Sequence, residues 1–563
     1  MKKLYTHSLL ALAAVFLFEP VNAQQKHGVT ARHAMVVSAH PEASRVGVEI
    51  LKRGGNAVDA AIAVQFALAV VYPNAGNIGG GGFMVYRLKD GSVGTLDYRE
   101  KAPAAAFEKM YLDSVGNVVA GLSVNGHLAA GVPGSVDGMA EAHKKLGSLP
   151  WRDLVQPAVD LARNGVILTE REANSLTRNR EEFVKHNTHT PYFVRDKPWQ
   201  KGDTLFHPAL ARTLERIRDN GRDGFYTGET ADMIVREMQT AKGIITHEDL
   251  RNYHAVWRDP MIGSYKRYKL VSMPPPSSGG VALFQLLKMM EKADLRQWGW
   301  QQASTVHWMA ESERRVYADR ATHLGDPDFY KVPVANLLKD SYLQERLQTI
   351  NMDKATPSAD IKAGIFARAE SDQTTHLSVV DASGNAVSVT TTLNGGYGSK
   401  VVVREAGFLL NNEMDDFSVK PGVPNIYGVI GGVANAIQPG KRMLSSMTPT
   451  IVERKGRLYM VVGTPGGSTI ITSVFQTILN VVEHRMGMQE AVSAKRFHHQ
   501  WLPDAILAEK EAFSPETKRA LEAKGHKINE VNAIGRVDAI LVRKKRKLEG
   551  GADPRGDDTA MGY

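Results

Sequence analysis

The chain has 563 residues, of which 43% are hydrophobic and 23% charged, and this ordinary globular composition excludes a disordered or fibrous protein. Lysine and arginine exceed aspartate and glutamate by nine, but both signs are interspersed, so we expect no nucleic-acid partner from the charge alone. Cysteine is absent, which excludes disulfides, thiolate nucleophiles and Cys-based metal sites. Any nucleophile is therefore an oxygen or a nitrogen.

The first 23 residues have the pattern of a secretory signal peptide. Lys2 and Lys3 precede an apolar run over residues 8–18, and small residues at Val21 and Ala23 suit a cleavage site. We expect cleavage after Ala23 and export to the periplasm or the cell exterior. An uncleaved anchor is less favoured because the run is shorter than the ~17 residues that a membrane span needs. No later stretch predicts a span.

The next segment predicts two helices and a hairpin. Residues 41–53 and 56–71 have helical character, and Gly54-Gly55 separates them. A glycine run then leads into two alternating segments, 83–88 and 93–98, joined by a Lys-Asp-Gly turn. This spacing is typical of a β-hairpin.

The middle of the chain predicts mostly helices, followed by an exposed linker. Residues 150–350 are mainly helical in pattern, with a proline-rich joint at 274–280. Residues 353–372 lose the apolar pattern and are interpreted as an exposed linker. Directly afterwards, residues 374–381 and 386–393 predict a second hairpin with β-branched arms.

A glycine-rich turn dominates the last third. Residues 458–462 predict a strand, residues 463–468 a Gly-Thr-Pro-Gly-Gly-Ser turn, and residues 470–483 a helix. Backbone amides at such a strand-to-helix turn can hold an anion.

Several of these segments closely resemble the γ-glutamyltransferases, also called γ-glutamyltranspeptidases. The matching motifs, in the family's order, are Asp97-Tyr98-Arg99-Glu100, Gln373-Thr374-Thr375-His376, residues 411–417, Leu444-Ser445-Ser446-Met447, residues 463–468, residues 496–501 and Asp553-Pro554-Arg555. The resemblance covers nearly the whole chain after the signal. It implies an α+β fold, the four-layer αββα sandwich of the N-terminal nucleophile hydrolases.

The resemblance makes Thr374 the nucleophile. A threonine hydroxyl is weak unless a base removes its proton. If Thr374 first attacks the carbonyl of Gln373, the resulting ester hydrolyses and frees an α-amine whose ordinary pKa near 8 suits that task. The two threonines at 374–375 would otherwise be ordinary strand residues.

The resemblance also assigns the groups that read the substrate. Arg99 would clamp the glutamyl α-carboxylate, for which its planar guanidinium is well shaped, and Asp416 would bind the α-ammonium. Further substrate-binding residues in the resemblance are Ser445 and Ser446 on the carboxylate, with Asn394, Glu413 and Tyr427 assisting. For Asn394 the interpretation as an ordinary Asn-Gly turn residue stays open, and Glu413 is a position that varies between Glu and Gln.

Three further positions complete the expected catalytic group. Thr392 would support the nucleophile's hydroxyl, with a plain strand residue as the alternative. Gly466 and Gly467 would donate backbone N–H groups to the tetrahedral oxyanion, where one good donor contributes a few kcal/mol. Their alternative role is a helix-entry turn.

Other features carry less weight. His498-His499 lacks metal-ligand spacing and is interpreted as structural, and we expect no metal or cofactor. The basic run at 543–547 is interpreted as an exposed turn. Met443 stands where many relatives carry proline, which puts the stiffness of the following serine loop in question.

The sequence therefore predicts an exported γ-glutamyltransferase and glutathione hydrolase that cleaves itself before Thr374. Its subunits would be residues 24–373 and 374–563, joined as a heterodimer, acting on glutathione or another γ-glutamyl donor with water, an amino acid or a peptide as acceptor. One alternative is a glutaryl or β-lactam side-chain acylase of the same fold. Another is an uncleaved, inactive glutamyl-binding protein.

Overall fold

The computed structural model describes residues 28–362, 374–420 and 433–563. The expected signal at 1–23 lies outside these residues, and so do Gln373 and Tyr427.

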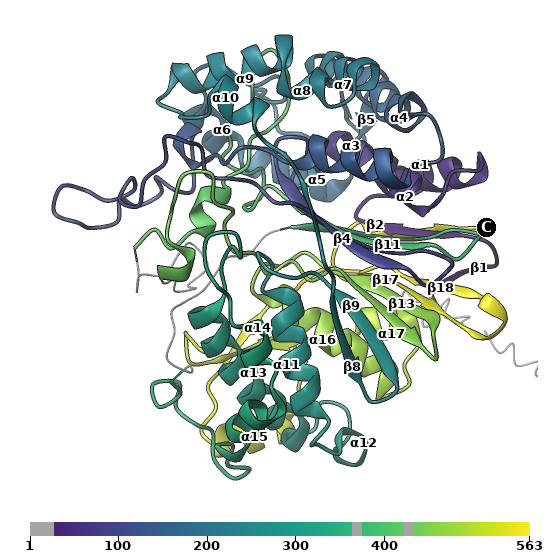
Figure 1. The fold of residues 1–563 in the computed structure, drawn as a ribbon, viewed down its shortest axis with the longest axis vertical. Helices are drawn as coiled ribbons and strands as arrows, with labels where there is room; N and C mark the ends of the chain where they lie inside the picture. Colours follow the sequence, from purple (N-terminus) through teal and green to yellow (C-terminus); the bar gives the residue numbers. More distant parts are fainter. Residues whose placement is uncertain (1–27, 363–373, 421–432) are drawn as a thin grey trace, which may run out of the picture.

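Two seven-stranded antiparallel sheets form the centre of the molecule (Figure 1). The first sheet has the order β19 (Thr559–Gly562), β2 (Met35–Ser38), β10 (Thr375–Val380), β11 (Ala386–Thr392), β3 (Gly81–Arg87), β4 (Val93–Tyr98) and β7 (Val256–Arg258). The second has the order β1 (Val29–Ala31), β18 (Leu548–Gly551), β17 (Asp538–Val542), β13 (Arg457–Gly463), β12 (Thr450–Arg454), β9 (Tyr268–Ser272) and β8 (Met261–Tyr265). The two predicted hairpins, formed by β3 with β4 and by β10 with β11, thus lie side by side in the first sheet.

Helices cover the outer faces of both sheets, above and below them in Figure 1. The first sheet's side carries α1 (Pro41–Lys52), α2 (Ala57–Val71), α3 (Ser135–Leu146), α4 (Trp151–Asn164), α5 (Glu170–Arg178), α6 (Arg180–His186), α7 (Pro208–Asn220), α8 (Asp223–Tyr226), α9 (Gly228–Thr240) and α10 (His247–Arg251). The second sheet's side carries α11 (Gly279–Met290), α12 (Leu295–Trp298), α13 (Ala303–His323), α14 (Val334–Leu337), α15 (Asp340–Gln348), α16 (Thr469–Val482), α17 (Met488–Ser493) and α18 (Pro515–Ala523). The predicted αββα sandwich is confirmed.

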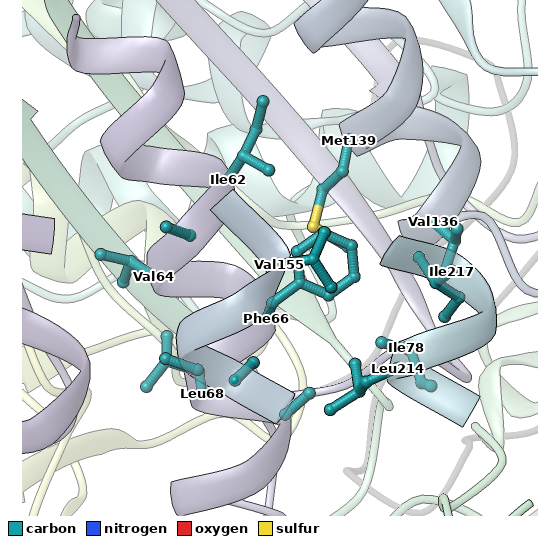
Figure 2. Close-up of a cluster of buried hydrophobic side chains, with 14 of the residues drawn as sticks. Ile62, Val64, Phe66, Leu68, Ile78, Val136, Met139, Val155, Leu214 and Ile217 are labelled. Carbon is teal, nitrogen blue, oxygen red and sulfur yellow. The ribbon is translucent and has the colours of Figure 1, made fainter. Parts of the chain in front are cut away.

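Helix α2 is the centre of the first core. All of its residues are buried, and it begins with a capping box in which Asn56 and Asp59 satisfy each other's backbone N–H groups. Figure 2 shows its side chains, among them Phe66, packed against Met139 of α3, Val155 of α4 and Leu214 of α7. A helix that is apolar all round is expected only where it is covered on every side.

One prediction of the chain's organisation is confirmed and one needs correction. The segment 150–350 is mostly helical, as predicted, and it also contains the short strands β5 (Val166–Ile167), β6 (Thr204–Leu205), β7, β8 and β9. The described part of the expected exposed linker is not wholly exposed, because Ala355, Ser358 and Ile361 are buried. The Ser358 N–H donates to Asp504, which fastens this segment to the C-terminal part of the chain.

Candidate active site

Thr374 lies directly before β10, near the middle of the first sheet. Thr375 pairs with Thr391 across β10 and β11, so the next step of the antiparallel register brings Thr374 beside Thr392. Side chains alternate along a strand, and Ser378 of β10 donates to the carbonyl of Asp538 in β17. Thr374 therefore projects from the face of β10 that is turned toward the second sheet.

His376 shares this face but is not placed to act as a base. Its Nδ1 lies 2.9 Å from the Thr390 hydroxyl and its Nε2 lies 3.1 Å from the Ser378 hydroxyl. Burial lowers the pKa of His376 to about 3, so the imidazole is neutral near pH 7. Its bonds hold the start of β10 in place.

The glycine-rich turn follows β13 beside the same end of β10. Gly463 packs so closely on the His376 ring that a Cβ there would lie 2.2 Å from Cε1. Gly466 and Gly467 have φ of +133° and +53°, which an L side chain rarely adopts. The hydroxyl of Tyr317 donates to the carbonyl of Ser468 and anchors the turn where α16 begins.

Arg99 follows β4 and is the centre of a buried charge cluster. Its Nη1 lies 2.6 Å from Glu413 Oε2 and 3.5 Å from Glu100 Oε2, and its Nη2 pairs with Asp416. The same guanidinium donates to the carbonyls of Met443, at 3.3 Å, and Leu444, at 3.1 Å. One cation thus joins β4, the 3₁₀ turn η2 (Glu413–Asp416) and the serine loop.

Three carboxylates around one guanidinium leave an excess of negative charge. Burial raises the pKa of Glu100 to about 8, although Arg99 opposes this rise. Burial also raises the pKa of Glu413 well above its usual range. Burial therefore favours the protonated form of these two carboxyl groups. Asp416 Oδ1 is buried and has no hydrogen-bond partner among the described residues.

Asparagines fix η2 against the end of β11. Asn411 accepts the N–H groups of Gly131, at 2.9 Å, and Glu413, at 3.0 Å. The Asn394 amide donates to the carbonyl of Asn412 at 3.0 Å, and the Asn394 N–H donates to the Thr392 hydroxyl at 2.7 Å. Asn394, at φ +70°, therefore has a bracing role in the described geometry.

The serine loop is held by the proline-rich joint. The N–H of Ser445 donates to Pro276 at 2.9 Å, and the N–H of Ser278 donates back to Ser445 at 2.6 Å. Met443 is fully buried in an apolar cluster with Met414 and Phe417. Packing of Met443 therefore holds the start of the serine loop in place.

Arg320 of α13 was missed by sequence reasoning. It is 1% exposed and donates to the hydroxyls of Ser278, at 2.8 Å, and Ser446, at 2.7 Å. Its helix is buried over most of its length despite a charge-rich sequence, which by pattern alone indicates a solvated face. Only the tertiary fold shows that these charges are internal.

We expect Arg320→Lys to raise KM for a γ-glutamyl donor by about ten- to a hundredfold. An ammonium group cannot reproduce the fork that holds both serines, and losing a hydrogen bond to a charged group costs about 1.5–3 kcal/mol. Arg315→Lys is the matched control, because Arg315 is equally buried on α13 but bonds Glu311. Steady-state kinetics of both variants measure the difference, and equal KM values would contradict the assignment.

The remaining predicted features have structural contacts only. His498 contacts the Thr472 hydroxyl at 2.9 Å and Gln500 at 3.0 Å, which fits its structural interpretation. Within residues 28–362, 374–420 and 433–563, no group of three acidic or histidine side chains could hold a metal. In the same ranges no helix is long and apolar enough to cross a membrane. The run 543–547 is exposed, as predicted.

The structure brings the predicted residues together in two adjoining groups. Thr374 and Thr392 lie side by side at one end of β10 and β11, and the glycine-rich turn begins at Gly463, which packs on His376. Arg99, Glu413, Asp416 and the serine loop form the charge cluster next to them, joined through the Asn394 and Asn411 bonds.

The comparisons with known proteins agree with this geometry. The sequence model of the family described as gamma-glutamyltranspeptidase matches residues 43–563. The chain belongs to this family. The glutathione hydrolase proenzyme of Escherichia coli K12 is 49% identical over 540 residues, covering 95% of this chain and 93% of the relative.

Two solved structures support the fold and the family. The cephalosporin acylase of Bacillus halodurans has a TM-score of 0.85 at 26% identity and covers 97% of this chain and 99% of its own. A chain of Helicobacter pylori gamma-glutamyltranspeptidase has a TM-score of 0.57 at 47% identity and covers 58% of this chain and 95% of its own. The fold is that of the N-terminal nucleophile hydrolases, and the chain is a γ-glutamyl-transferring enzyme.

Proposed function

We propose that the protein is an exported γ-glutamyltransferase and glutathione hydrolase that matures by cutting itself before Thr374. The observations that carry this proposal are the buried Arg99–Asp416 pair and the position of Thr374 directly before β10, opposite Thr392. In this proposal Thr374 is the nucleophile, and the Arg99 cluster supplies both positive and negative groups to the substrate.

Self-cleavage would proceed by an acyl shift. The Thr374 hydroxyl attacks the Gln373 carbonyl carbon, the peptide C–N bond breaks, and an ester forms. Water then hydrolyses the ester, which leaves the carboxylate on Gln373 and a free amine on Thr374. Proenzyme relatives and the Helicobacter chain, which matches only 58% of this chain, support a product of two chains, residues 24–373 and 374–563.

The charge cluster fits an α-amino acid head group. A carboxylate bridging to Arg99 and the Ser445 and Ser446 hydroxyls would gain charge-assisted hydrogen bonds. An ammonium would meet Asp416, whose Oδ1 has no hydrogen-bond partner in the described residues. The zwitterion of a γ-glutamyl group carries both charges at one end.

Catalysis would then use the new α-amine of Thr374 as the base. The amine takes the hydroxyl proton, the oxygen attacks the γ-carbonyl, and the Gly466 and Gly467 N–H groups stabilise the oxyanion. The leaving amine takes the proton, and the glutamyl ester remains on Thr374. Water or an acceptor amine attacks this ester and restores the hydroxyl. Thr392 and Glu413 would orient the groups around it.

A side-chain acylase is the second candidate. The Bacillus halodurans acylase structure, at a TM-score of 0.85, favours it as a fold relative. Such an enzyme would not need Asp416 to bind an ammonium group. The two candidate functions therefore differ in whether the donor substrate carries an α-ammonium.

We expect a γ-glutamyl anilide to be turned over at least roughly tenfold faster than a glutaryl anilide that lacks only the amine. Removing the amine leaves the buried Oδ1 of Asp416 without a partner, although its Oδ2 stays paired with Arg99. Such an unsatisfied charged oxygen costs about 1.4 kcal/mol or more, a factor of about ten. The substitution Asp416→Asn should reduce the preference for the γ-glutamyl anilide over the glutaryl anilide, because asparagine keeps the shape of the side chain and removes its negative charge. Measured kcat/KM values for both donors provide the ratio.

Asp415→Asn is the matched control for this test. Asp415 is buried beside Asp416, but its carboxylate accepts the Ser123 hydroxyl at 2.5 Å. The control should leave the donor ratio within about twofold. Equal rates on both donors in the unmodified enzyme would reject γ-glutamyl transfer and favour the acylase.

A further inference from the structure

A large basic groove lies at the end of the sandwich opposite Thr374. It has a volume of about 670 Å³ and lies between turns of the two sheets. We call it the basic groove, and six of its lining residues are central to its charge: Arg32, Lys89, Arg454, Arg457, Lys544 and Lys545. These residues come from four separate places in the sequence, so only folding gathers them.

The positive charge of the groove is not compensated locally. None of those six side chains forms an ion pair with a carboxylate in the described part of the chain. Asp381 is the acidic residue of the lining, and its carboxylate accepts the N–H groups of Ala57, at 3.0 Å, and Gly384, at 2.8 Å. Two further acids nearby are paired with arginines, since Glu453 holds Arg87 and Glu549 holds Arg543. Asp90, beside Lys89, accepts the N–H and the hydroxyl of Ser92, so the net charge of the groove stays positive.

The groove is held open by contacts between the two sheets. The Arg87 guanidinium of β3 donates to the Gly456 carbonyl in the β12–β13 turn at 3.0 Å. Arg546, beyond β17, donates to the Ala382 carbonyl in the β10–β11 turn at 3.1 Å. The exposed lysines therefore extend from a fixed scaffold.

Strand β10 separates the groove from the nucleophile. Thr374 precedes its first residue and Asp381 follows its last, so seven steps of ~3.3 Å place the two sites about 23 Å apart. In Figure 1 the groove end includes the yellow turn between β17 and β18 at the right of the sheets. A large partner bound there leaves the active-site end facing away.

We propose that the basic groove docks the enzyme on a negatively charged lipid surface, through the phosphate groups of the lipids. Lysines and arginines without ion pairs, at or near several turns, can approach a flat lipid surface together. Their individual contributions to the binding free energy then add. Nucleic acid is the poorer fit, because the groove's aromatic residue, Tyr459, packs against Tyr268 with ring centroids 5.0 Å apart and offers no free face for base stacking.

The test is co-sedimentation of the purified enzyme with vesicles. We expect binding to vesicles of phosphatidylcholine mixed with phosphatidylglycerol, and at least tenfold less binding to phosphatidylcholine alone. Raising the salt from about 0.05 M to about 0.3 M should release the enzyme, because the screening length shortens. The triple variant Arg457→Gln, Lys544→Gln, Lys545→Gln should lose at least tenfold in affinity for the mixed vesicles.

A second triple variant controls for net charge. Lys185→Gln, Lys197→Gln and Lys201→Gln remove the same charge from exposed positions among the helices of the first layer, and should bind within about twofold of the parent. Hydrolysis of a γ-glutamyl anilide in solution should be unchanged in both triples, which shows that each is folded.

Three results would overturn the proposal. The first is equal binding by the two triple variants, and the second is equal binding of the parent to both vesicle types. The third is displacement from mixed vesicles by duplex DNA or by inorganic phosphate at matched ionic strength, since this would assign the groove to a nucleic acid or to a free anion.

Discussion

Thr374→Ala should yield a single uncut chain with no measurable transferase or hydrolase activity. The substitution removes the hydroxyl that attacks Gln373 and also the hydroxyl that accepts the glutamyl group. Loss of a catalytic nucleophile typically reduces kcat by on the order of 10⁶-fold. Gel electrophoresis and an assay with a γ-glutamyl anilide measure the two losses separately.

Thr375→Ala is the matched control for this result. Thr375 is the adjacent residue, but it lies on the opposite face of β10, and its hydroxyl has no hydrogen-bond partner in the described residues. It should mature and retain activity, and Thr374→Ser should retain part of both functions. A Thr374→Ala protein that still appears as two chains would show that another residue cuts the precursor.

Arg99→Lys should lower kcat/KM for γ-glutamyl donors by about a hundredfold. The ammonium of lysine cannot hold a substrate carboxylate in two bonds while also meeting the carbonyls of Met443 and Leu444, and charge-assisted bonds contribute about 1.5–3 kcal/mol each. The small chain should still form, which separates donor binding from maturation.

Arg87→Lys tests whether this effect is specific. Arg87 is buried in the same β3–β4 hairpin, but at its far end, where it pairs with Glu453. It should stay within about threefold of the parent in kcat/KM. A similar loss in both variants would mean that Arg99 supports the hairpin and does not read the donor.

The local elements were predictable because their patterns are strong. The arms of the 374–393 hairpin and the turn at 463–468 have β-branched or glycine-rich signatures that depend on few distant contacts. The strands β7 to β9 were missed because each is at most five residues long and lies in a helical context. The linker prediction failed in part because Ser358 and Ile361 are covered by distant segments.

The residues of the candidate site could be predicted only where they belong to a motif of the family. Arg99 and the serines were found from the family resemblance, whereas Arg320 was not, because a charged residue in a helix gives no sign that it is buried. The basic groove was likewise hidden: the run at 543–547 was visible, but its neighbours Arg32, Lys89 and Arg457 are far apart in the sequence. Tertiary contacts decide both cases.

The most direct measurement is the intact mass of the small chain, taken by rapid quench during turnover of a γ-glutamyl donor. The account predicts a chain that begins at Thr374 and transiently gains the mass of one glutamyl group, which peptide mapping places on that residue. An active preparation that is a single full-length chain, or a glutamyl group on any other residue, would contradict it.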